Sequence, residues 1–375
     1  MKILLTDIYF RKSFDVINIL KLHYQKSDFI FTDSSVSLIK SLKSKLIYGS
    51  RNIHLLRMDD NFEKDLLKIA KVFDEDIIYI PIEEGTTIKF AEFLSKNKTT
   101  KFKYLLTSLD NFSTSRNKEA LNIFCEKNEI ACPKYISEQT LQRKEFTFPL
   151  ICKPKHGSGA KGITYIENEE DLKQLKIDFS ESFVQERLPN PKDVEAGFFL
   201  CEKGEIKSFY SHKRIRTYPE KGGVTVFSQC TYSSEIKKIG SSVIQKLNWS
   251  GILMIEFIFD ERDKTYKLIE INPRLWGSVL LSEFCGLDFL ENYIELSLGK
   301  SVLKTEVKSH KFIRWIFPYD ILFWLKHLSN PFKFFKIKNN TCYINFTYSS
   351  LKRSLLFIFL TYFSLNKIGK LLKNG

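Results

Sequence analysis

The sequence lacks the cysteine patterns that mark metal-binding and disulfide-rich proteins. Its seven cysteines are scattered over 375 residues, are odd in number and include no CxxC pair. Structural zinc sites and disulfide frameworks both rely on such regular spacing. We therefore expect neither, and this favours a reducing compartment.

Long apolar segments are missing as well. The first apolar run covers only residues 3–5, which is too short for the core of a signal peptide. The longest run, 355–363, is too short to cross a bilayer. We expect a cytoplasmic protein, and the composition of the C-terminal segment leaves peripheral attachment to the inner face of the membrane open.

Acidic residues are scarce towards the C-terminal end. Residues 301–375 contain 13 Lys and Arg but only two acidic residues, Glu306 and Asp320. This segment accounts for most of the chain's formal charge of +14, so the remainder is close to neutral. A neutral body with a basic end is typical of an enzyme or binding domain with a basic tail, and we expect no nucleic-acid partner.

Strand-like and helix-like segments alternate in the first hundred residues, which predicts a small parallel sheet covered by helices. Residues 61–72 show a helical pattern of apolar positions. No glycine-rich phosphate loop follows the first strand, because residues 8–11 read Ile-Tyr-Phe-Arg, so this part is not an obvious dinucleotide site. The strand-like runs are 2–7, 28–32, 76–82 and 103–107.

A glycine-rich loop at 156–162 joins two strand-like runs. Its glycines spell GxGxxG, but β-branched Ile163 and Thr164 begin a strand where the Rossmann fingerprint requires a helix. A Walker A loop is also excluded, because no Gly-Lys-Ser/Thr closes the motif. Backbone N–H groups of such a loop, with lysines beside them, can cover a triphosphate. A tight hairpin with solvated lysines is the alternative for this loop alone.

Residues 251–278 read as two strands joined by a charged turn at 261–264. Glu270 and Asn272 have the same parity on the second strand and so share one face of the sheet. If the strands pair as a hairpin, Glu256 on the first strand can lie opposite them. Two carboxylates and an amide oxygen suit a hard cation such as Mg²⁺, and Arg274 adds a fork for an anion. The alternative is a solvated hairpin face with a salt bridge.

Taken in order, these elements resemble the ATP-grasp superfamily, in particular its carboxylate–amine ligases and carbamoyl-phosphate-synthase-like enzymes. The resemblance covers about residues 111–300. It rests on the strand-end Lys153 before the glycine loop, V-Q-E-R-L at 184–188, P-x-x-G-G at 219–223, and a pattern E-x13-E-x-N-x-R that begins at Glu256. The last pattern is specific, whereas a glycine loop alone is not.

The resemblance implies an α/β N-terminal domain followed by an α+β ATP-grasp fold, in which two subdomains clasp ATP, and then a basic, aromatic-rich extension. The expected boundaries are 1–110 for the N-terminal domain, 111–300 for the ATP-grasp domain (111–180 glycine-loop subdomain, 181–300 metal-binding subdomain) and 301–375 for the extension.

The resemblance also implies an ATP site. Lys153 would reach the α- and β-phosphates, and the loop would fold over them. Gln185 would accept from the adenine amino group, although an acidic residue is more frequent at that position, and Asp193 would hold the ribose. The expected nucleotide-binding residues are Lys153, Lys155, Gly157, Ser158, Gly159, Gly162, Gln185, Glu186, Leu188 and Asp193.

The implied metal ligands are Glu256, Glu270 and Asn272, which would hold Mg²⁺, or Mn²⁺ in its place, between the β- and γ-phosphates. The implied catalytic residues are Arg274, Lys153 and Arg216. Arg274 would stabilise the transferring phosphoryl group. Arg214 and Arg216, with Gly222 and Gly223, would line the acceptor side, where the arginines would pair with a substrate carboxylate. A surface-exposed basic strand is the alternative for 212–216.

The implied reaction activates a small carboxylate as an acyl phosphate, which an amine then attacks. It needs no protein nucleophile, and the sequence shows no Ser-His-Asp or Cys-His signature. The alternative is a catalytically silent ATP-binding scaffold or regulatory protein at the membrane surface. The intact set of Glu256, Glu270, Asn272 and Arg274 argues against such a loss of turnover.

The C-terminal segment departs from a plain ATP-grasp core. Residues 311–375 hold 16 aromatic residues, and Lys and Arg flank their apolar runs. This composition suits an interfacial segment on an anionic bilayer. An extension that packs on the core or forms a homodimer is the alternative.

Overall fold

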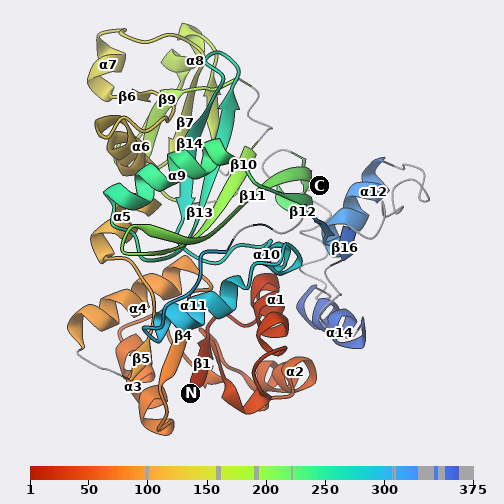
Figure 1. The fold of residues 1–375 in the computed structure, drawn as a ribbon. Coiled ribbons are helices and arrows are strands. Elements are labelled where there is room, and N and C mark those ends of the chain that lie inside the picture. The colour runs from red at the N-terminus through yellow and green to blue at the C-terminus, as the bar shows by residue number, and fades with distance from the viewer. Residues whose placement is uncertain are drawn as a thin grey trace.

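The computed structural model contains three β-sheets with helices around them (Figure 1). The N-terminal sheet lies at the bottom of the view and a four-stranded sheet at the top, with a seven-stranded sheet between them. The structure describes residues 1–97, 101–157, 162–189, 194–220, 223–305, 307, 310–327, 342–344 and 351–362.

The N-terminal sheet is parallel, with strand order β3-β2-β1-β4-β5. Because side chains alternate along a strand, Ile3 and Leu5 of β1 pack with one helical layer, α1 and α2, and Leu4 packs with the other, α3 and α4. Its elements are β1 Lys2–Leu5, α1 Arg11–Leu20, η1 Lys26–Asp28, β2 Phe29–Asp33, α2 Leu38–Tyr48, β3 His54–Leu55, α3 Phe62–Val72, β4 Ile77–Ile80, α4 Glu84–Lys96 and β5 Phe102–Lys103.

The four-stranded sheet is antiparallel, in the order β6-β9-β7-β8. Asn168 caps α8 by accepting from the N–H groups of Glu170 and Asp171. Its elements, with the helices beside them, are α5 Leu109–Arg116, α6 Lys118–Lys127, β6 Tyr135–Ile136, α7 Glu138–Gln142, β7 Leu150–Pro154, β8 Thr164–Ile166, α8 Glu169–Gln174 and β9 Ser182–Glu186.

One helix expected from the sequence is divided in two. The apolar stripe of residues 115–128 suggests a single helix capped by Ser115, but the chain breaks between α5 and α6 at Asn117. Asn117 has an extended backbone, and its side chain accepts from the N–H groups of Glu119 and Ala120. The expectation was wrong because an asparagine cap restarts the helix within the apolar pattern.

The seven-stranded sheet has the order β14-β13-β10-β11-β12-β15-β16 and is antiparallel except for the β15–β16 pair. The turn at Lys203 and Gly204, both with positive φ, joins β10 to β11. Its elements, with their helices, are β10 Val194–Glu202, β11 Glu205–Tyr218, β12 Val224–Thr231, α9 Ser234–Lys246, β13 Gly251–Asp260, β14 Thr265–Asn272, α10 Leu280–Phe284, α11 Phe289–Ser297, β15 Phe312–Arg314 and β16 Cys342–Ile344.

The described parts of the C-terminal extension pack on the rest of the molecule. Trp315 is fully buried, and Phe357 stacks on Phe14 of α1 with ring centroids 4.3 Å apart. The buried Asp320 carboxylate pairs with Arg216 and Arg314. The elements here are η2 Ile316–Asp320, α12 Ile321–His327 and α14 Leu351–Tyr362.

Two expectations drawn from missing sequence features can be compared with the structure. Cys230 of β12 and Cys285 are paired as a disulfide, a single bridge that the scattered cysteines did not predict and that is not the regular framework the sequence argued against. The free cysteines of the described chain are Cys125, Cys132, Cys152 and Cys201. None of the helices in the described ranges has both the length and the apolar character needed to cross a bilayer.

Candidate active site

A cavity of about 460 Å³ opens between the four-stranded and the seven-stranded sheets. Strands β7 and β9 contribute Lys153 and Gln185 to its lining, and β13 and β14 contribute Glu256 and Glu270. The structure thus brings together most of the site residues expected from the sequence. Those that line the cavity are Lys153, Gly157, Gln185, Glu186, Leu188, Glu256, Glu270, Asn272 and Arg274.

The hairpin of β13 and β14 places its acidic residues directly across from each other. In the antiparallel register Glu256 is paired with Glu270, and Met254 with Asn272. Burial, and then the charge of Glu256, raises the pKa of Glu270 to about 7, while Lys118 and Lys153 act in the opposite direction. A bound cation would stabilise these two facing carboxylates and favour the charged form of Glu270.

The residues of the hairpin fit a magnesium ion bound together with phosphate. Among the described residues, no group of three or more His, Cys, Asp and Glu could hold a metal by itself. Mg²⁺ is usually held by one or two carboxylates, waters and substrate phosphates rather than by a complete protein cage. The Glu256–Glu270 pair with the buried amide of Asn272 matches that donor set.

Cationic side chains surround these carboxylates. Arg214 of β11 forms an ion pair with Glu256, and Lys118 Nζ lies 3.7 Å from Glu270. Lys118 Nζ also donates to the Gly157 carbonyl at 2.5 Å. It therefore connects the Glu270 carboxylate to the start of the glycine loop. Burial lowers the pKa of Lys153 to about 8, and its Nζ lies 5.6 Å from the ring centroid of Phe183.

Arg274 is held at the edge of the cavity by Asn272 of its own segment and by the distant helix α4. Its Nη2 donates to Asn272 Oδ1 at 3.2 Å, and its Nε lies 3.4 Å from Glu84 of the N-terminal helix α4. Arg116 forms a second ion pair with Glu84, at 3.1 Å. These contacts fix the guanidinium beside the carboxylate pair.

The loop that follows Asn272 is also fixed to the N-terminal domain. The Leu275 N–H donates to the Pro81 carbonyl at 3.0 Å, and Lys12 Nζ donates to the Leu275 carbonyl at 3.2 Å. Lys12 pairs with Glu83 at 2.7 Å, while burial, followed by the charge of Arg274, lowers the pKa of Lys12 to about 8. The carboxyl end of β4 and the start of α1 thus hold the loop that follows Asn272.

The segment 184–188, which was expected to contact the adenine, begins in β9 and continues just past its end. Gln185 is buried and pairs with Ile151 of β7 and Tyr135 of β6. The Glu186 N–H donates to the Lys134 carbonyl at 2.9 Å, and the Glu186 carboxylate accepts from the Lys134 N–H at 2.8 Å. Both the backbone and the carboxylate of Glu186 therefore hold segment 184–188 against Lys134. The Glu186 backbone N–H already has a protein acceptor.

Some expected nucleotide-binding residues do not line the cavity. Lys155 pairs with Glu119 at 2.5 Å. Gly162 has φ +72°, and a Cβ there would lie 2.9 Å from the ring of Pro154, so only glycine fits the return of the loop. Ser158, Gly159, Asp193 and Gly222 lie outside the described residues.

The expectation for Arg216 requires correction. The resemblance implied that Arg214 and Arg216 both line the acceptor side, and on a regular strand residues of equal parity do share a face. Register shifts between β11 and β12 lie on both sides of Arg216. Arg214 lines the cavity, whereas Arg216 pairs with the buried Asp320 and stacks on Phe227 and Phe323.

Three cavity residues were not identified as site residues from the sequence. Lys118 begins α6, and Arg11 begins α1, where its Nη2 donates to the Gly277 carbonyl at 3.1 Å. His212 is buried, its Nδ1 lies 3.3 Å from Ser278 Oγ, and its Nε2 has no hydrogen-bond partner in the described chain. Burial lowers the pKa of His212 well below its usual range. No local motif marks Lys118 and Arg11, because each reaches the cavity from a distant segment, whereas His212 lies two residues before Arg214 on β11.

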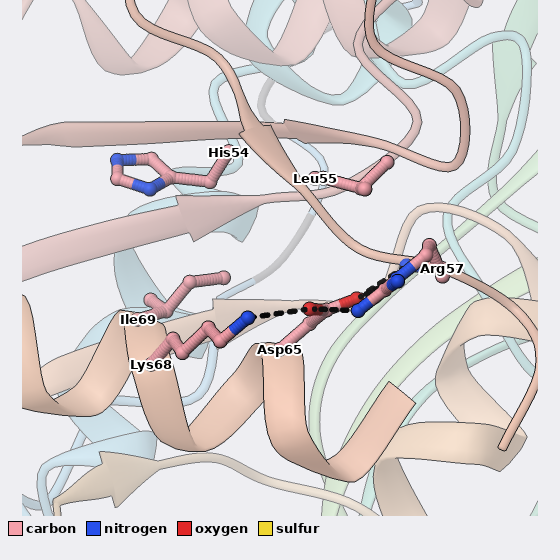
Figure 2. A pocket seen from close by; sticks show the side chains of 6 residues that line it. All are labelled: His54, Leu55, Arg57, Asp65, Lys68 and Ile69. Carbon is pink, nitrogen blue, oxygen red and sulfur yellow. Dashed lines mark hydrogen bonds and ion pairs between the residues drawn. The ribbon is translucent and has the colours of Figure 1, made fainter. Parts of the chain in front are cut away.

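A smaller hollow of about 300 Å³ lies beside the edge strand β3 (Figure 2). Figure 2 shows Arg57, Asp65 and Lys68 turned towards one another across it. Arg57 forms a two-point ion pair with Asp65 through Nε at 2.9 Å and Nη2 at 3.0 Å. Asp65 is the one carboxylate among the six described lining residues and is already paired with Arg57, so the larger cavity is the candidate active site.

A family model decides the relationship. The model of the ATP-binding domain of the carbamoyl-phosphate synthase L chain matches residues 110–305. The chain belongs to this family. Its fold is an ATP-grasp fold, as the motifs at Lys153 and at Glu256 to Arg274 suggested.

Relatives and solved structures agree with this family. The carbamoyl phosphate synthase large chain of Clostridium perfringens is 24% identical over 259 residues, which are 64% of this chain and 24% of that protein. Among solved structures, N5-carboxyaminoimidazole ribonucleotide synthetase from Thermotoga maritima has a TM-score of 0.58 at 19% identity, covering 82% of this chain and 78% of the other. Biotin carboxylase from Campylobacter jejuni has a TM-score of 0.62 at 14% identity, covering 83% and 73%.

The curated relatives are much longer than this ATP-grasp chain. It spans 7% of acetyl-CoA carboxylase 2 from Arabidopsis thaliana and 24% of the clostridial synthase. The matches to solved structures show the shared fold.

Proposed function

We propose that the protein is an ATP- and Mg²⁺-dependent ligase that activates a small carboxylate as an acyl phosphate and joins it to an amine. The observation that carries this proposal is the facing pair Glu256 and Glu270, with Arg274 beside it and Lys153 across the same cavity. In this reading two carboxylates hold the metal, and the cations bind phosphate.

The chain's own residues have distinct tasks in this reaction. Lys153 and Lys118 lie near Glu270 and attract the phosphate chain of the nucleotide. Gln185 and Leu188 line the part of the cavity that would take the adenine. Glu256, Glu270 and Asn272 would hold Mg²⁺, which would supply positive charge to the phosphates of the nucleotide. Arg274 stabilises the charge of the transferring phosphoryl group.

The reaction balances without a protein nucleophile. A carboxylate oxygen attacks the γ-phosphorus, and ADP leaves. The amine nitrogen then attacks the acyl carbon, phosphate leaves, and the nitrogen loses a proton. The enzyme contributes positioning and charge, which is consistent with a site rich in cations and carboxylates.

The acceptor carboxylate is expected near Arg214 and Arg11. Both line the cavity, and they approach it from different domains, on β11 and at the start of α1. Arg214 pairs with Glu256 in the structure, and a metal bound at Glu256 would leave its guanidinium available to a substrate. The buried His212, beside Ser278, adds a polar group to the cavity lining that also includes Arg214 and Arg11.

A screen for ATP consumption tests the proposal. Phosphate release is measured with amino acids, uronic acids and small amines, and mass spectrometry identifies the products. We expect turnover that depends on Mg²⁺ and on one carboxylate. ATP binding without turnover across the panel would favour the silent scaffold instead.

Matched variants locate the activity. Glu270→Gln removes a metal ligand and is expected to lower turnover at least about a hundredfold. Glu261→Gln changes an exposed residue in the turn of the same hairpin and is expected to leave turnover unchanged. Equal rates in the two variants would contradict the site assignment.

A further inference from the structure

Helix α2 turns an apolar face towards solvent. Leu38, Leu42 and Leu46 follow each other at the four-residue spacing of one helical face and are 78%, 54% and 59% exposed, and Ile39 beside them is 66% exposed. A surface helix normally presents polar residues there and buries its apolar stripe. The face of α2 that packs inwards, with Ile47 and Tyr48, is apolar as well.

Helix α14 continues this exposed face. It lies beside α2 (Figure 1), and Lys43 Nζ of α2 donates to the Leu360 carbonyl of α14 at 2.8 Å. Phe357 and Ile358 point into the molecule and hold the helix in place. Leu355 and Phe359, four residues apart, are 52% and 58% exposed.

Basic residues surround the exposed apolar residues. The stretch from Ser34 to Arg57 contains no acidic residue but carries Lys40, Lys43 and Lys45 on α2. Helix α14 adds Lys352 and Arg353, and the sequence contains no acidic residue after Asp320. The nearby Asp33 pairs with Lys40 at 2.5 Å, so these two charges cancel and the positive charge lies on Lys43, Lys45 and the basic residues of α14. The surface is therefore apolar at its centre and positive around it.

We propose that α2 and α14 form a docking surface for an anionic lipid bilayer. The exposed leucines and Phe359 would enter the boundary between headgroups and acyl chains, and the lysines would lie among the anionic headgroups. This assigns membrane contact to the N-terminal domain as well as to the C-terminal extension. It is independent of the ligase reaction.

A second copy of the chain fits this surface less well. A two-fold symmetric contact would place the α2 face against itself and bring the same lysines together. Like charges facing each other oppose association, whereas an anionic bilayer neutralises all of them. The positive charge of this surface therefore favours an anionic bilayer over a second copy of the chain.

Docking in this orientation leaves the candidate active site accessible. In Figure 1, α2 and α14 lie at the lower right, and the four-stranded sheet that covers the cavity lies at the top. The surface can therefore be altered without touching any residue of the cavity, and substitutions on α2 are expected to keep ATP binding.

Co-sedimentation of the full chain with vesicles tests the proposal. Vesicles of phosphatidylcholine with phosphatidylglycerol are compared with vesicles of phosphatidylcholine alone. We expect binding to the anionic vesicles that weakens as salt is raised. Leu42→Glu and Leu46→Glu should each lower the partition coefficient at least about tenfold, because each removes an inserted side chain and adds a repelled charge.

The matched control is Val72→Glu. Val72 ends α3 in the other helical layer of the N-terminal domain and is 63% exposed, so this change alters surface charge equally but away from the proposed surface. Its vesicle binding should stay close to that of the unchanged protein. Circular dichroism confirms that all three variants fold.

Three results would overturn the proposal. The first is failure of the unchanged protein to bind anionic vesicles. The second is vesicle binding that the two leucine variants retain in full. The third is a dimer in light scattering that both leucine variants dissociate, which would identify a second copy as the occupant.

Discussion

Replacing Glu270 by Gln is expected to stabilise the metal-free protein at alkaline pH while removing its metal ligand. The Glu270 side chain is half-buried at the cavity wall, faces Glu256, and has a pKa raised from 4.5 to about 7. The folded protein therefore favours the neutral form of this side chain, and Gln is a neutral group of similar shape.

The size of the stability change follows from the difference in proton binding between the folded and the unfolded protein. A raised folded-state pKa means that the folded protein holds a proton which the unfolded chain has lost between about pH 4.5 and pH 7. Stability consequently falls as pH rises through that window and then stays lower. Each pKa unit corresponds to about 1.4 kcal/mol, so the charged carboxylate costs at most about 3.5 kcal/mol at pH 8. The variant should recover much of this.

Urea denaturation without Mg²⁺ at pH 8 and at pH 5 provides the assay. At pH 8 the variant should unfold at a higher urea concentration than the unchanged protein. At pH 5 the difference should largely disappear, because Glu270 is then already protonated in the folded protein. Adding Mg²⁺ with a nonhydrolysable ATP analogue should stabilise the unchanged protein more than the variant.

A variant that is less stable at pH 8 would refute this reasoning. It would mean that the ion pair with Lys118, at 3.7 Å, contributes more than burial and the repulsion from Glu256 remove. Glu261→Gln, in the exposed turn of the same hairpin, serves as the control and should show no pH-dependent gain.

Three further changes test other parts of the structure. Arg274→Lys keeps the positive charge but loses the planar guanidinium that can contact two phosphate oxygens at once. We expect kcat to fall by about two orders of magnitude, with little change in the nucleotide affinity measured by calorimetry. Asp320→Ala leaves Arg216 and Arg314 buried without their shared carboxylate, and chemical denaturation should show a loss of about 3–5 kcal/mol. Phe357→Ala removes the ring stacked on Phe14 and should cost about 3–5 kcal/mol in the same assay, whereas unchanged stability would show that α14 is not held by this contact.

The sequence predicted those features that depend on local periodicity. Strand parity placed Glu270 and Asn272 on one face, and the register of β13 and β14 places Glu256 opposite Glu270. The strand–loop–strand around the glycine loop and the end of β9 near Gln185 were also readable, because β-branched residues and turn residues mark their limits.

Features that depend on distant segments or on irregular pairing could not be predicted. Arg11, Lys118 and Glu84 reach the site from three separate helices, and no spacing along the chain relates them to Arg274. The resemblance to the ATP-grasp superfamily implied a place in the cavity for Arg216 as well as for Arg214. The register shifts beside it turn it to Asp320 instead, and such bulges have no sequence signal here.

The attachment of the Arg274 loop to the N-terminal domain limits what the family segment can do alone. Residues 110–305 contain both glutamates and the glycine loop, but Glu84, Pro81 and Lys12, which hold Arg274 and Leu275, lie before that segment. A fragment cut at residue 110 would keep the metal ligands and lose the partners that orient the guanidinium. Under the proposed function, we expect such a fragment to bind the nucleotide and to transfer the phosphoryl group poorly.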